Sequence, residues 1–241
     1  MPVLVVIPAR LGSTRLPQKP LQPLGGVPLI VRVAQRVQEH GIADRLVIAT
    51  DAEAVVAAAQ AAGLDARMTG AQHPSGTDRV YELSSRGEFD RFDEILNVQG
   101  DTPFIPAEAV TGALAQLRRG FDVGTAAVPL EAESDDPARV KVVMTAEGKA
   151  LYFSRAAIPY GAARAWRHLG VYAYTRDALH RIATAAPSPL ERSEGLEQLR
   201  ALELGLRIGV ERLSEPAAPE IDTWEDLREA ETHWTVTQGV T

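Results

Sequence analysis

Near the N-terminus an apolar run leads directly into a basic loop, Val3-Leu4-Val5-Val6-Ile7-Pro8-Ala9-Arg10-Leu11-Gly12-Ser13-Thr14-Arg15-Leu16-Pro17-Gln18-Lys19-Pro20. The β-branched run predicts a buried strand. Pro8 has no backbone N–H and favours an extended residue before it, so we expect the strand to end there. The loop that follows carries small residues among three cations, Arg10, Arg15 and Lys19. Small residues let backbone N–H groups approach an anion and cations neutralise phosphate charge, so the loop predicts a polyphosphate site.

The loop matches neither of two familiar phosphate-binding signatures. It lacks the Gly-x-x-x-x-Gly-Lys-Ser/Thr spacing of a P-loop. It also lacks the Gly-x-Gly-x-x-Gly of a dinucleotide fold, which disfavours a redox Rossmann protein. By charge and glycine content alone, the loop is a generic anion site or a solvated connection between a strand and a helix.

Composition excludes several classes of function. The 241 residues suit one large α/β domain or two small ones, and 45% of them are hydrophobic, enough for a sizeable core. The net charge of −7 argues against a nucleic-acid binder and against binding to an anionic membrane surface. The absence of cysteine excludes disulfides, thiolate catalysis and zinc–thiolate sites. No apolar run reaches the roughly 20 residues of a membrane span and no signal peptide is recognisable, so we expect a soluble, cytoplasmic protein.

Apolar runs alternate with helical patterns through the first half of the chain. The predicted elements are strands at 3–7, 46–50, 65–68, 94–98 and 123–128, and helices at 28–40, 52–62, from about 77, and at 106–119. This alternation predicts an α/β, Rossmann-like fold, in which a mostly parallel sheet is flanked by helices and the crossovers are right-handed.

The pattern changes in the second half of the chain. The expected elements are a β-hairpin at 140–144 and 150–153, an irregular loop at 159–167, a strand at 169–174, a helix at 177–185, one helix from Ser188 to about 204, a strand at 208–211 and a last helix from a capping-box pattern at Asp222 to about 233. The hairpin is therefore expected to be inserted into the α/β fold.

Four polar segments follow predicted strands. They are residues 8–20, Thr50-Asp51, residues 73–79 and residues 99–103. Ligands of an open α/β sheet bind beyond the carboxyl ends of its strands, so we expect these segments to form one site.

Asp101 is the candidate metal ligand, because it follows a buried strand and Gly100 and should lie at the tip of that strand. Mg²⁺ takes oxygen ligands and often shares them with phosphates. Asp222 is the acid that we would pair with Asp101. The alternatives are a turn residue for Asp101 and a helix N-cap for Asp222, and an N-cap carboxylate can still keep one oxygen for a metal.

Other polar residues allow both a structural and a functional interpretation. Ser75, Gly76 and Arg79 either contact a base and ribose or cap a helix. Arg155 is suited to bind a carboxylate with two hydrogen bonds, whereas a lone histidine such as His168 is more often structural. Four polar residues have the spacing of one helix face: Glu191, Glu194, Glu197 and Gln198. This face is either exposed to solvent or presents hydrogen-bond acceptors to the hydroxyls of a sugar.

Taken together, these motifs resemble the 3-deoxy-manno-octulosonate cytidylyltransferases, or CMP-KDO synthetases. The basic loop looks like the signature loop of sugar nucleotidyltransferases. The motifs that narrow the resemblance occur in family order: Ala49-Thr50-Asp51, His73–Arg79, Asn97–Asp101, Val140–Val143, Leu151–Arg155, Arg167–Tyr172, Leu196–Arg200 and Asp222-Thr223. The resemblance covers residues 2 to about 233.

The resemblance implies an activity and an organisation. The activity is transfer of CMP from CTP to the anomeric C2 hydroxyl of KDO with release of pyrophosphate, for lipopolysaccharide or related glycan synthesis. The fold would be of the nucleotide-diphospho-sugar transferase type, a single domain over residues 1–241 that forms a homodimer. Within it the resemblance implies a CTP-binding half at 1–128, a hairpin-containing acceptor and dimer region at 129–186, and an acceptor and metal-binding part at 187–234.

The resemblance also implies roles for individual residues. Catalytic roles fall to Arg10, Lys19, Asp101 and Asp222, and Mg²⁺ would be held by Asp101 and Asp222. The residues that would contact CTP are Pro8, Ala9, Arg10, Ser13, Arg15, Lys19, Thr50, Ser75, Gly76, Arg79, Gln99, Gly100 and Asp101. The residues that would form the sugar pocket, with Arg155 near the sugar carboxylate, are Gln99, Arg155, His168, Tyr172, Glu194, Glu197, Gln198 and Asp222.

Several positions depart from the family pattern. Thr102 stands where the family usually has Glu, Trp224 where it commonly has Pro, and residues 159–167 form a shorter loop. Changes also occur at Arg192-Ser193 and Gly195, beside the expected sugar pocket. The alternatives are therefore a cytidylyltransferase for another acid sugar, such as an amino-KDO or a sialic acid, or a non-catalytic nucleotide-binding regulator. Retention of Lys19 and both aspartates favours the enzyme.

Overall fold

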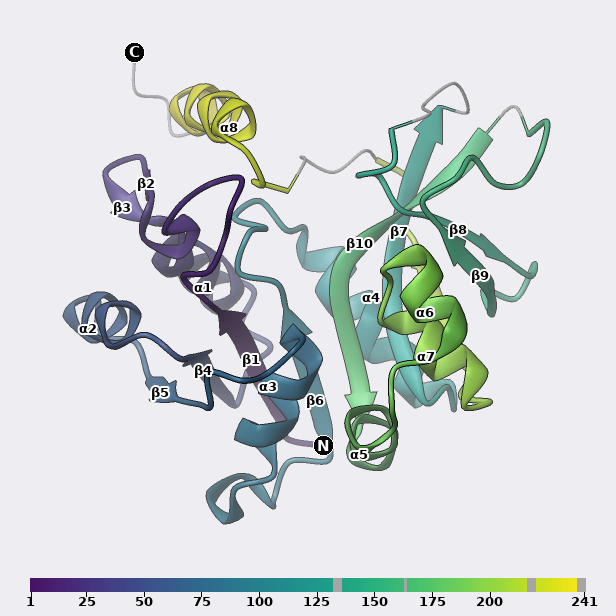
Figure 1. Ribbon diagram of the computed structural model, residues 1–241, viewed down its shortest axis with the longest axis horizontal. Helices are drawn as coiled ribbons and strands as arrows, with labels where there is room; N and C mark the ends of the chain where they lie inside the picture. Colours follow the sequence, from purple (N-terminus) through teal and green to yellow (C-terminus); the bar gives the residue numbers. More distant parts are fainter. Residues whose placement is uncertain (132–135, 163, 216–219, 238–241) are drawn as a thin grey trace. The chain divides into compact units, whose positions relative to one another are not determined.

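The computed structural model describes residues 1–131, 136–162, 164–215 and 220–237 (Figure 1). The chain forms two compact units. We call the first the loop unit, because it contains the basic loop; it comprises Leu4–Phe89, Val98–Ile105 and Ala218–Thr241. The second, the hairpin unit, comprises Met1–Val3, Asp90–Asn97 and Pro106–Ala217. Each unit is assembled from segments that are distant in sequence.

Three parallel strands bring polar segments of the loop unit to one edge. They are β1 (Val3–Ala9), β4 (Arg45–Thr50) and β5 (Ala66–Met68). In their register Ala9 lies beside Thr50, and Thr50 lies beside Met68. The three strands therefore end together, as expected for the carboxyl edge of a parallel sheet.

Helices and one small hairpin complete the loop unit. Their bounds are η1 (Lys19–Leu21), β2 (Pro23–Leu24), β3 (Val27–Pro28), α1 (Leu29–Glu39), α2 (Glu53–Ala61), α3 (Gly76–Ser84), η2 (Gly87–Phe89) and α8 (Trp224–Thr237). The apolar residues of α1, among them Leu29, Ile30 and Val33, are fully buried. This amphipathic pattern is why residues 29–39 form a helix that covers the core.

The hairpin unit is built on longer strands. Its strands are β6 (Glu94–Val98), β7 (Val123–Glu131), β8 (Lys141–Met144), β9 (Ala150–Ser154), β10 (Arg164–Thr175) and β11 (Ile208–Arg212). β7 pairs antiparallel with β10 and parallel with β11. β8 and β9 form the antiparallel hairpin, and Lys141 of β8 pairs with Arg167 of β10.

Four helices accompany these strands. They are α4 (Ala107–Arg118), α5 (Arg176–Thr184), α6 (Pro189–Glu194) and α7 (Gln198–Glu203). α4 packs on β7, β10 and β11, whereas α7 contacts β9 (Figure 1). Aliphatic and alanine side chains form most of the core, as the small aromatic content requires. In the described part of the chain, no helix has the length and apolar character needed to cross a membrane.

The predicted α/β class is confirmed, because parallel pairing recurs in both units and helices flank the strands. The predicted hairpin is also confirmed. The prediction of one helix from Ser188 to about 204 is wrong, since the left-handed Gly195 (φ 64°) ends α6 and separates it from α7. Part of the predicted irregular loop is strand, because β10 already begins at Arg164. Residue 163 of that loop lies outside the described residues.

Candidate active site

The basic loop of the loop unit is anchored by buried apolar residues. Leu16 is fully buried, and Pro20 is buried at the start of η1. The Ser13 hydroxyl accepts a hydrogen bond from the Leu16 N–H at 3.3 Å. Gln18 adopts a left-handed conformation (φ 52°) immediately before η1. These contacts fix the backbone at Lys19, whose side chain carries the central charge of the site.

Lys19 joins two acids that come from distant parts of the sequence. Its Nζ lies 2.6 Å from Asp101 Oδ2 and 2.9 Å from Asp222 Oδ1. Arg15 adds a second cation, with its guanidinium 3.1 Å from Asp222 Oδ2. The Lys19 and Asp101 side chains are only 14% and 15% exposed, so this ion pair is shielded from solvent. The structure thus places four of the predicted site residues in one cluster.

The cluster shifts the pKa values of Lys19 and Asp222 in opposite directions. Burial alone would lower the pKa of Lys19, but the Asp101 and Asp222 carboxylates raise it above its ordinary value. Burial alone would raise the pKa of Asp222, but Lys19 and then Arg15 hold it below its ordinary value. Lys19 and Asp222 are therefore both charged at neutral pH.

The start of α8 corrects one prediction. Thr223, not Asp222, caps the helix, because its hydroxyl accepts from the Asp226 N–H at 3.2 Å and its carbonyl accepts from the Leu227 N–H at 3.1 Å. Asp222 precedes the cap, so its carboxylate is available to Lys19 and Arg15. Asp226 was not among the predicted site residues. The Thr-Trp-Glu-Asp pattern at 223–226 is the signal that could have revealed it.

The two acids suit a magnesium ion that takes its remaining ligands from phosphate oxygens. Asp101 Oδ1 is buried and has no hydrogen-bond partner among the described residues. An unsatisfied buried carboxylate oxygen is costly, and such oxygens are the ligands that Mg²⁺ prefers. The described residues contain no cluster of three acids or histidines that could hold a metal. Any Mg²⁺ here would need further oxygens from phosphate or water, which is usual for this ion.

Gly100 lets the loop before Asp101 lie against the end of β1. A Cβ at this position would lie 3.0 Å from the Pro8 carbonyl oxygen and 3.1 Å from the Ile30 side chain. A Cβ built on Gly76 would lie 3.4 Å from the Pro8 ring, so Pro8, Gly76 and Gly100 are neighbours. The Thr102 hydroxyl donates to the Gln99 carbonyl at 2.8 Å and closes the turn.

The remaining predicted nucleotide contacts have structural partners within the loop unit. Arg79 is only 2% exposed, and it donates to Asp51 Oδ2 at 2.9 Å and to the Thr69 hydroxyl at 2.5 Å. Ser75 caps α3, and the fully buried Thr50 accepts from the Ala52 N–H at 3.2 Å. Arg10 is exposed. Contacts of these residues with a base or ribose remain predictions.

The predicted sugar-binding residues divide between the two units. Gln99 and Asp222 belong to the loop unit, and the other members belong to the hairpin unit: Arg155, His168, Tyr172, Glu194, Glu197 and Gln198. Glu197 and Gln198 lie where α7 begins.

Arg155 and Glu194 are joined within the hairpin unit. Glu194 accepts from the Ser154 hydroxyl at 2.7 Å and from the Arg155 N–H at 3.0 Å. Although burial raises the pKa of Glu194, these hydrogen bonds hold it below its ordinary value. The Arg155 guanidinium donates to backbone carbonyls of Pro137, Glu194 and Gly195. It therefore links the hairpin to the end of α6.

His168 is buried in β10 beside aromatic rings. Its Nε2 lies 2.9 Å from the Thr125 hydroxyl, which donates to the Val171 carbonyl at 2.7 Å. The hydroxyl must then accept from His168, which places the ring proton on Nε2. The Tyr172 ring lies 5.1 Å away, between centroids. Burial, followed by the Arg167 charge, lowers the pKa of His168 to about 3, so the ring is neutral.

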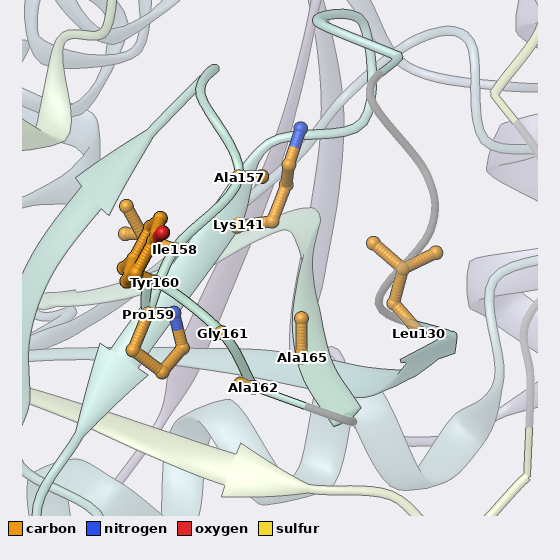
Figure 2. A pocket seen from close by; sticks show the side chains of 9 residues that line it. All are labelled: Leu130, Lys141, Ala157, Ile158, Pro159, Tyr160, Gly161, Ala162 and Ala165. Atoms are coloured by element: carbon orange, nitrogen blue, oxygen red, sulfur yellow. The ribbon is translucent and has the colours of Figure 1, made fainter.

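A pocket of about 250 Å³ lies in the hairpin unit. Residues 157–162 form one wall, and Leu130 and Ala165 face them (Figure 2). Lys141 also lines it, but its ammonium donates to the carbonyls of Asp136 and Arg155 at 2.9 and 2.7 Å. This lysine therefore ties the pocket wall to the segment that carries Arg155.

Comparison with known proteins agrees with this geometry. The family model described as cytidylyltransferase matches residues 4–208. A 3-deoxy-manno-octulosonate cytidylyltransferase of Gemmatimonas aurantiaca is 51% identical over 98% of this chain and 95% of its own length. This chain belongs to the 3-deoxy-manno-octulosonate cytidylyltransferase family. Members from Azorhizobium caulinodans and Agrobacterium fabrum are 49% and 44% identical, over 86% and 94% of the chain and 86% and 92% of their own lengths.

A solved structure supports membership of this family. The structure of a CMP:2-keto-3-deoxy-manno-octonic acid synthetase complexed with CTP superposes with a TM-score of 0.91 at 36% identity and covers 100% of both chains. A glucose-1-phosphate thymidylyltransferase from Bacillus anthracis superposes with a TM-score of 0.67 at 17% identity, over 96% of this chain and 95% of its own. The second likeness shows the fold alone.

Proposed function

We propose that this chain transfers CMP from CTP to the anomeric C2 hydroxyl of KDO and releases pyrophosphate. The observation that carries the proposal is the cluster in which Lys19 joins Asp101 and Asp222 beside the basic loop. Relatives named 3-deoxy-manno-octulosonate cytidylyltransferase, which are 44–51% identical over most of the chain, support the proposal. The solved synthetase complexed with CTP supports it as well.

The triphosphate of CTP would lie against the basic loop. Arg10, Ser13, Arg15 and Lys19 contribute three positive charges and one hydroxyl there. Lys19 and Arg15 would exchange their carboxylate partners for phosphate oxygens when the nucleotide binds. The cytidine would face the remaining nucleotide-binding set: Pro8, Ala9, Thr50, Ser75, Gly76, Arg79, Gln99 and Gly100. Fixed charges of this kind align a phosphate and stabilise the charge that develops on it.

Asp101 and Asp222 would hold Mg²⁺ with the carboxylate oxygens that Lys19 leaves. Mg²⁺ bound there would neutralise negative charge on the α-phosphate and would lower the pKa of the acceptor hydroxyl. In the reaction the hydroxyl oxygen bonds to the α-phosphorus and loses its proton to solvent, while the bond from that phosphorus to the pyrophosphate oxygen breaks and pyrophosphate leaves. Lys19 and Arg10 would neutralise the departing pyrophosphate.

The acceptor would be recognised by charge and hydrogen bonding. Arg155 would bind the sugar carboxylate, and the sugar hydroxyls would face other residues of the hairpin unit: His168, Tyr172, Glu194, Glu197 and Gln198. Because His168 is neutral with its proton on Nε2, its Nδ1 would accept a hydrogen bond.

We further propose that the protein is a cytoplasmic homodimer that contacts its partner through the hairpin unit and serves lipopolysaccharide or related glycan synthesis. Tyr160 is fully exposed and Leu151 is 55% exposed, so this unit presents apolar side chains to solvent. Replacing both with serine should convert a dimer into a monomer in light scattering. A monomeric unmodified protein would contradict this proposal.

The decisive experiment measures pyrophosphate release from CTP and Mg²⁺ with KDO, an amino-KDO and a sialic acid. We expect release with KDO. If pyrophosphate is released only with another acid sugar, that sugar is the acceptor and KDO is not. No release with any of them, together with intact CTP binding, would favour a non-catalytic nucleotide-binding regulator.

A further inference from the structure

The backbone on both sides of Asp222 is held by hydrogen bonds. The Ile221 N–H donates to the Asp101 carbonyl at 3.0 Å, so the residue before Asp222 is tied to the other acid of the cluster. An aspartate has a short side chain, and its carboxylate can move little once its backbone is fixed. The position of Asp222 in the cluster therefore depends on what holds residues 222–223.

One oxygen of Asp226 holds these two residues. Its Oδ2 accepts from the Asp222 N–H at 2.9 Å, from the Thr223 N–H at 2.8 Å and from the Thr223 hydroxyl at 2.9 Å. The Thr223 hydroxyl in turn accepts from the Asp226 N–H at 3.2 Å. A capping box normally satisfies only donors of its own helix. Here it reaches one residue further, to the backbone of Asp222.

α8 itself is anchored at its far end. Glu231 accepts from the Gly25 N–H at 3.0 Å, in the β2–β3 turn that lies beside α8 (Figure 1). The Arg32 guanidinium lies 4.0 Å from the Trp234 ring centroid. The His233 ring packs edge-on against Phe104, three residues after Asp101, at 4.6 Å between centroids. Asp226 is thus fixed by a helix that contacts the same loop that carries Asp101.

We propose that Asp226 is a positioning residue for the transfer reaction, which sets the Asp222 carboxylate at the distance from Asp101 that a shared Mg²⁺ requires. The inference rests on the proposed function. Asp226 touches neither substrate nor metal in this role. It acts through the backbone of residues 222–223, as residues that orient metal ligands commonly do.

Three variants separate positioning from charge. Asp226→Ala removes the accepting oxygen. Asp226→Asn keeps an oxygen in its place but removes the charge. Glu225→Ala is the matched control, because it removes one negative charge from an exposed side chain in the same helical turn.

Isothermal titration calorimetry of CTP, with Mg²⁺ and with EDTA, measures the gain in affinity that the metal provides. We expect Asp226→Ala to reduce that gain by about tenfold, the lower end of the range for residues that orient metal ligands. CTP affinity in EDTA should stay within twofold of the wild type. Asp226→Asn and Glu225→Ala should keep the gain. In turnover, Asp226→Ala should raise the Mg²⁺ concentration for half-maximal rate by a similar factor.

An unchanged gain in Asp226→Ala, or an equal loss in Glu225→Ala, would overturn the inference. If Asp226→Ala does not fold, Asp226→Ser replaces it, since its hydroxyl is too short to reach all three donors. A wild-type protein that gains CTP affinity from Mg²⁺ but releases no pyrophosphate would defeat the proposed function and leave the calorimetric comparison to decide this inference. If wild-type CTP binding shows no gain from Mg²⁺, this inference fails, whereas pyrophosphate release still decides the proposed function.

Discussion

Lys19 and Asp101 form a shielded ion pair, with Nζ 2.6 Å from Oδ2, although 82 residues separate them in the sequence. The same ammonium contacts Asp222, so one internal cation holds together two acids that would otherwise repel each other. The stability of the loop unit and its capacity for a metal should therefore depend on the same charge.

Lys19→Met should destabilise the protein and increase its response to Mg²⁺. The substitution keeps the apolar stem, leaves Asp101 without its cation and leaves Asp222 with Arg15 alone, which should cost on the order of 3 kcal/mol of unfolding free energy. Urea denaturation measures this loss, and Mg²⁺ should restore more stability to the variant than to the wild type. Arg36→Met is the control, because its pair with Glu39 is exposed and should be worth less than about 1 kcal/mol. Equal losses in the two variants would contradict the prediction.

Asp101→Ala should abolish measurable pyrophosphate release, because it removes both the partner of Lys19 and the buried oxygen that suits a metal. Asp177→Ala, at an exposed position on α5 with 78% of the side chain in solvent, should retain full activity. Circular dichroism of both variants checks that they fold. Near-normal turnover in folded Asp101→Ala would refute the metal assignment.

His168 should make the protein less stable as the pH falls. Its pKa is about 3 in the folded state and near 6.5 in an unfolded chain, so the unfolded chain binds the proton more tightly. The contribution is fully present above pH 6.5 and is lost as the pH falls toward 3. Between pH 7 and 5 the loss should be about 2 kcal/mol. The carboxylates with lowered pKa values lose their contributions below this window, under about pH 4.5.

Urea denaturation at pH 7, 6 and 5 tests this dependence. His168→Gln should flatten the change in unfolding free energy, whereas His180→Gln, at an exposed helix position, should not. An identical pH dependence in wild type and His168→Gln would show that the buried ring is not the cause.

Gly100→Ala should strain the turn that carries Asp101, because its Cβ would press on the Pro8 carbonyl at 3.0 Å and on Ile30 at 3.1 Å. Overpacking of this kind costs about 1–3 kcal/mol. A thermal melt should show the loss, and CTP affinity should fall with it. Gly12→Ala, where a Cβ would meet no atom within 4 Å, should leave stability within about 0.5 kcal/mol of the wild type. Unchanged melting of Gly100→Ala would argue against the close approach.

Local sequence signals were sufficient for much of the fold. The apolar run before Pro8 predicted β1, and the alternation of strands and helices predicted the α/β class. The break at Gly195 was missed because the helical spacing of Glu191, Glu194 and Gln198 continues across it. Only the left-handed backbone at Gly195 reveals that α6 and α7 are separate.

The sequence indicated which residues could belong to the Lys19 cluster, but it did not indicate how they pair with one another. Asp101 was recognisable because it follows a strand and a glycine. The cap of α8 was placed one residue too early, since Asp222 and Thr223 are both good N-cap residues and Glu225 and Asp226 are both good partners. In the structure the Asp222 carboxylate pairs with Lys19, 203 residues away in the sequence, and no local pattern reveals that contact.

The ion pairs among Lys19, Arg15, Asp101 and Asp222 also affect the order in which the metal and the nucleotide bind. Lys19 and Arg15 offset the charges of Asp101 and Asp222, so a free divalent ion meets little net attraction there. A triphosphate draws the same two cations toward itself and exposes the acids. We therefore expect the metal to bind together with the nucleotide. Binding of CTP would then create the metal site, and the protein without nucleotide would have little affinity for free divalent ions.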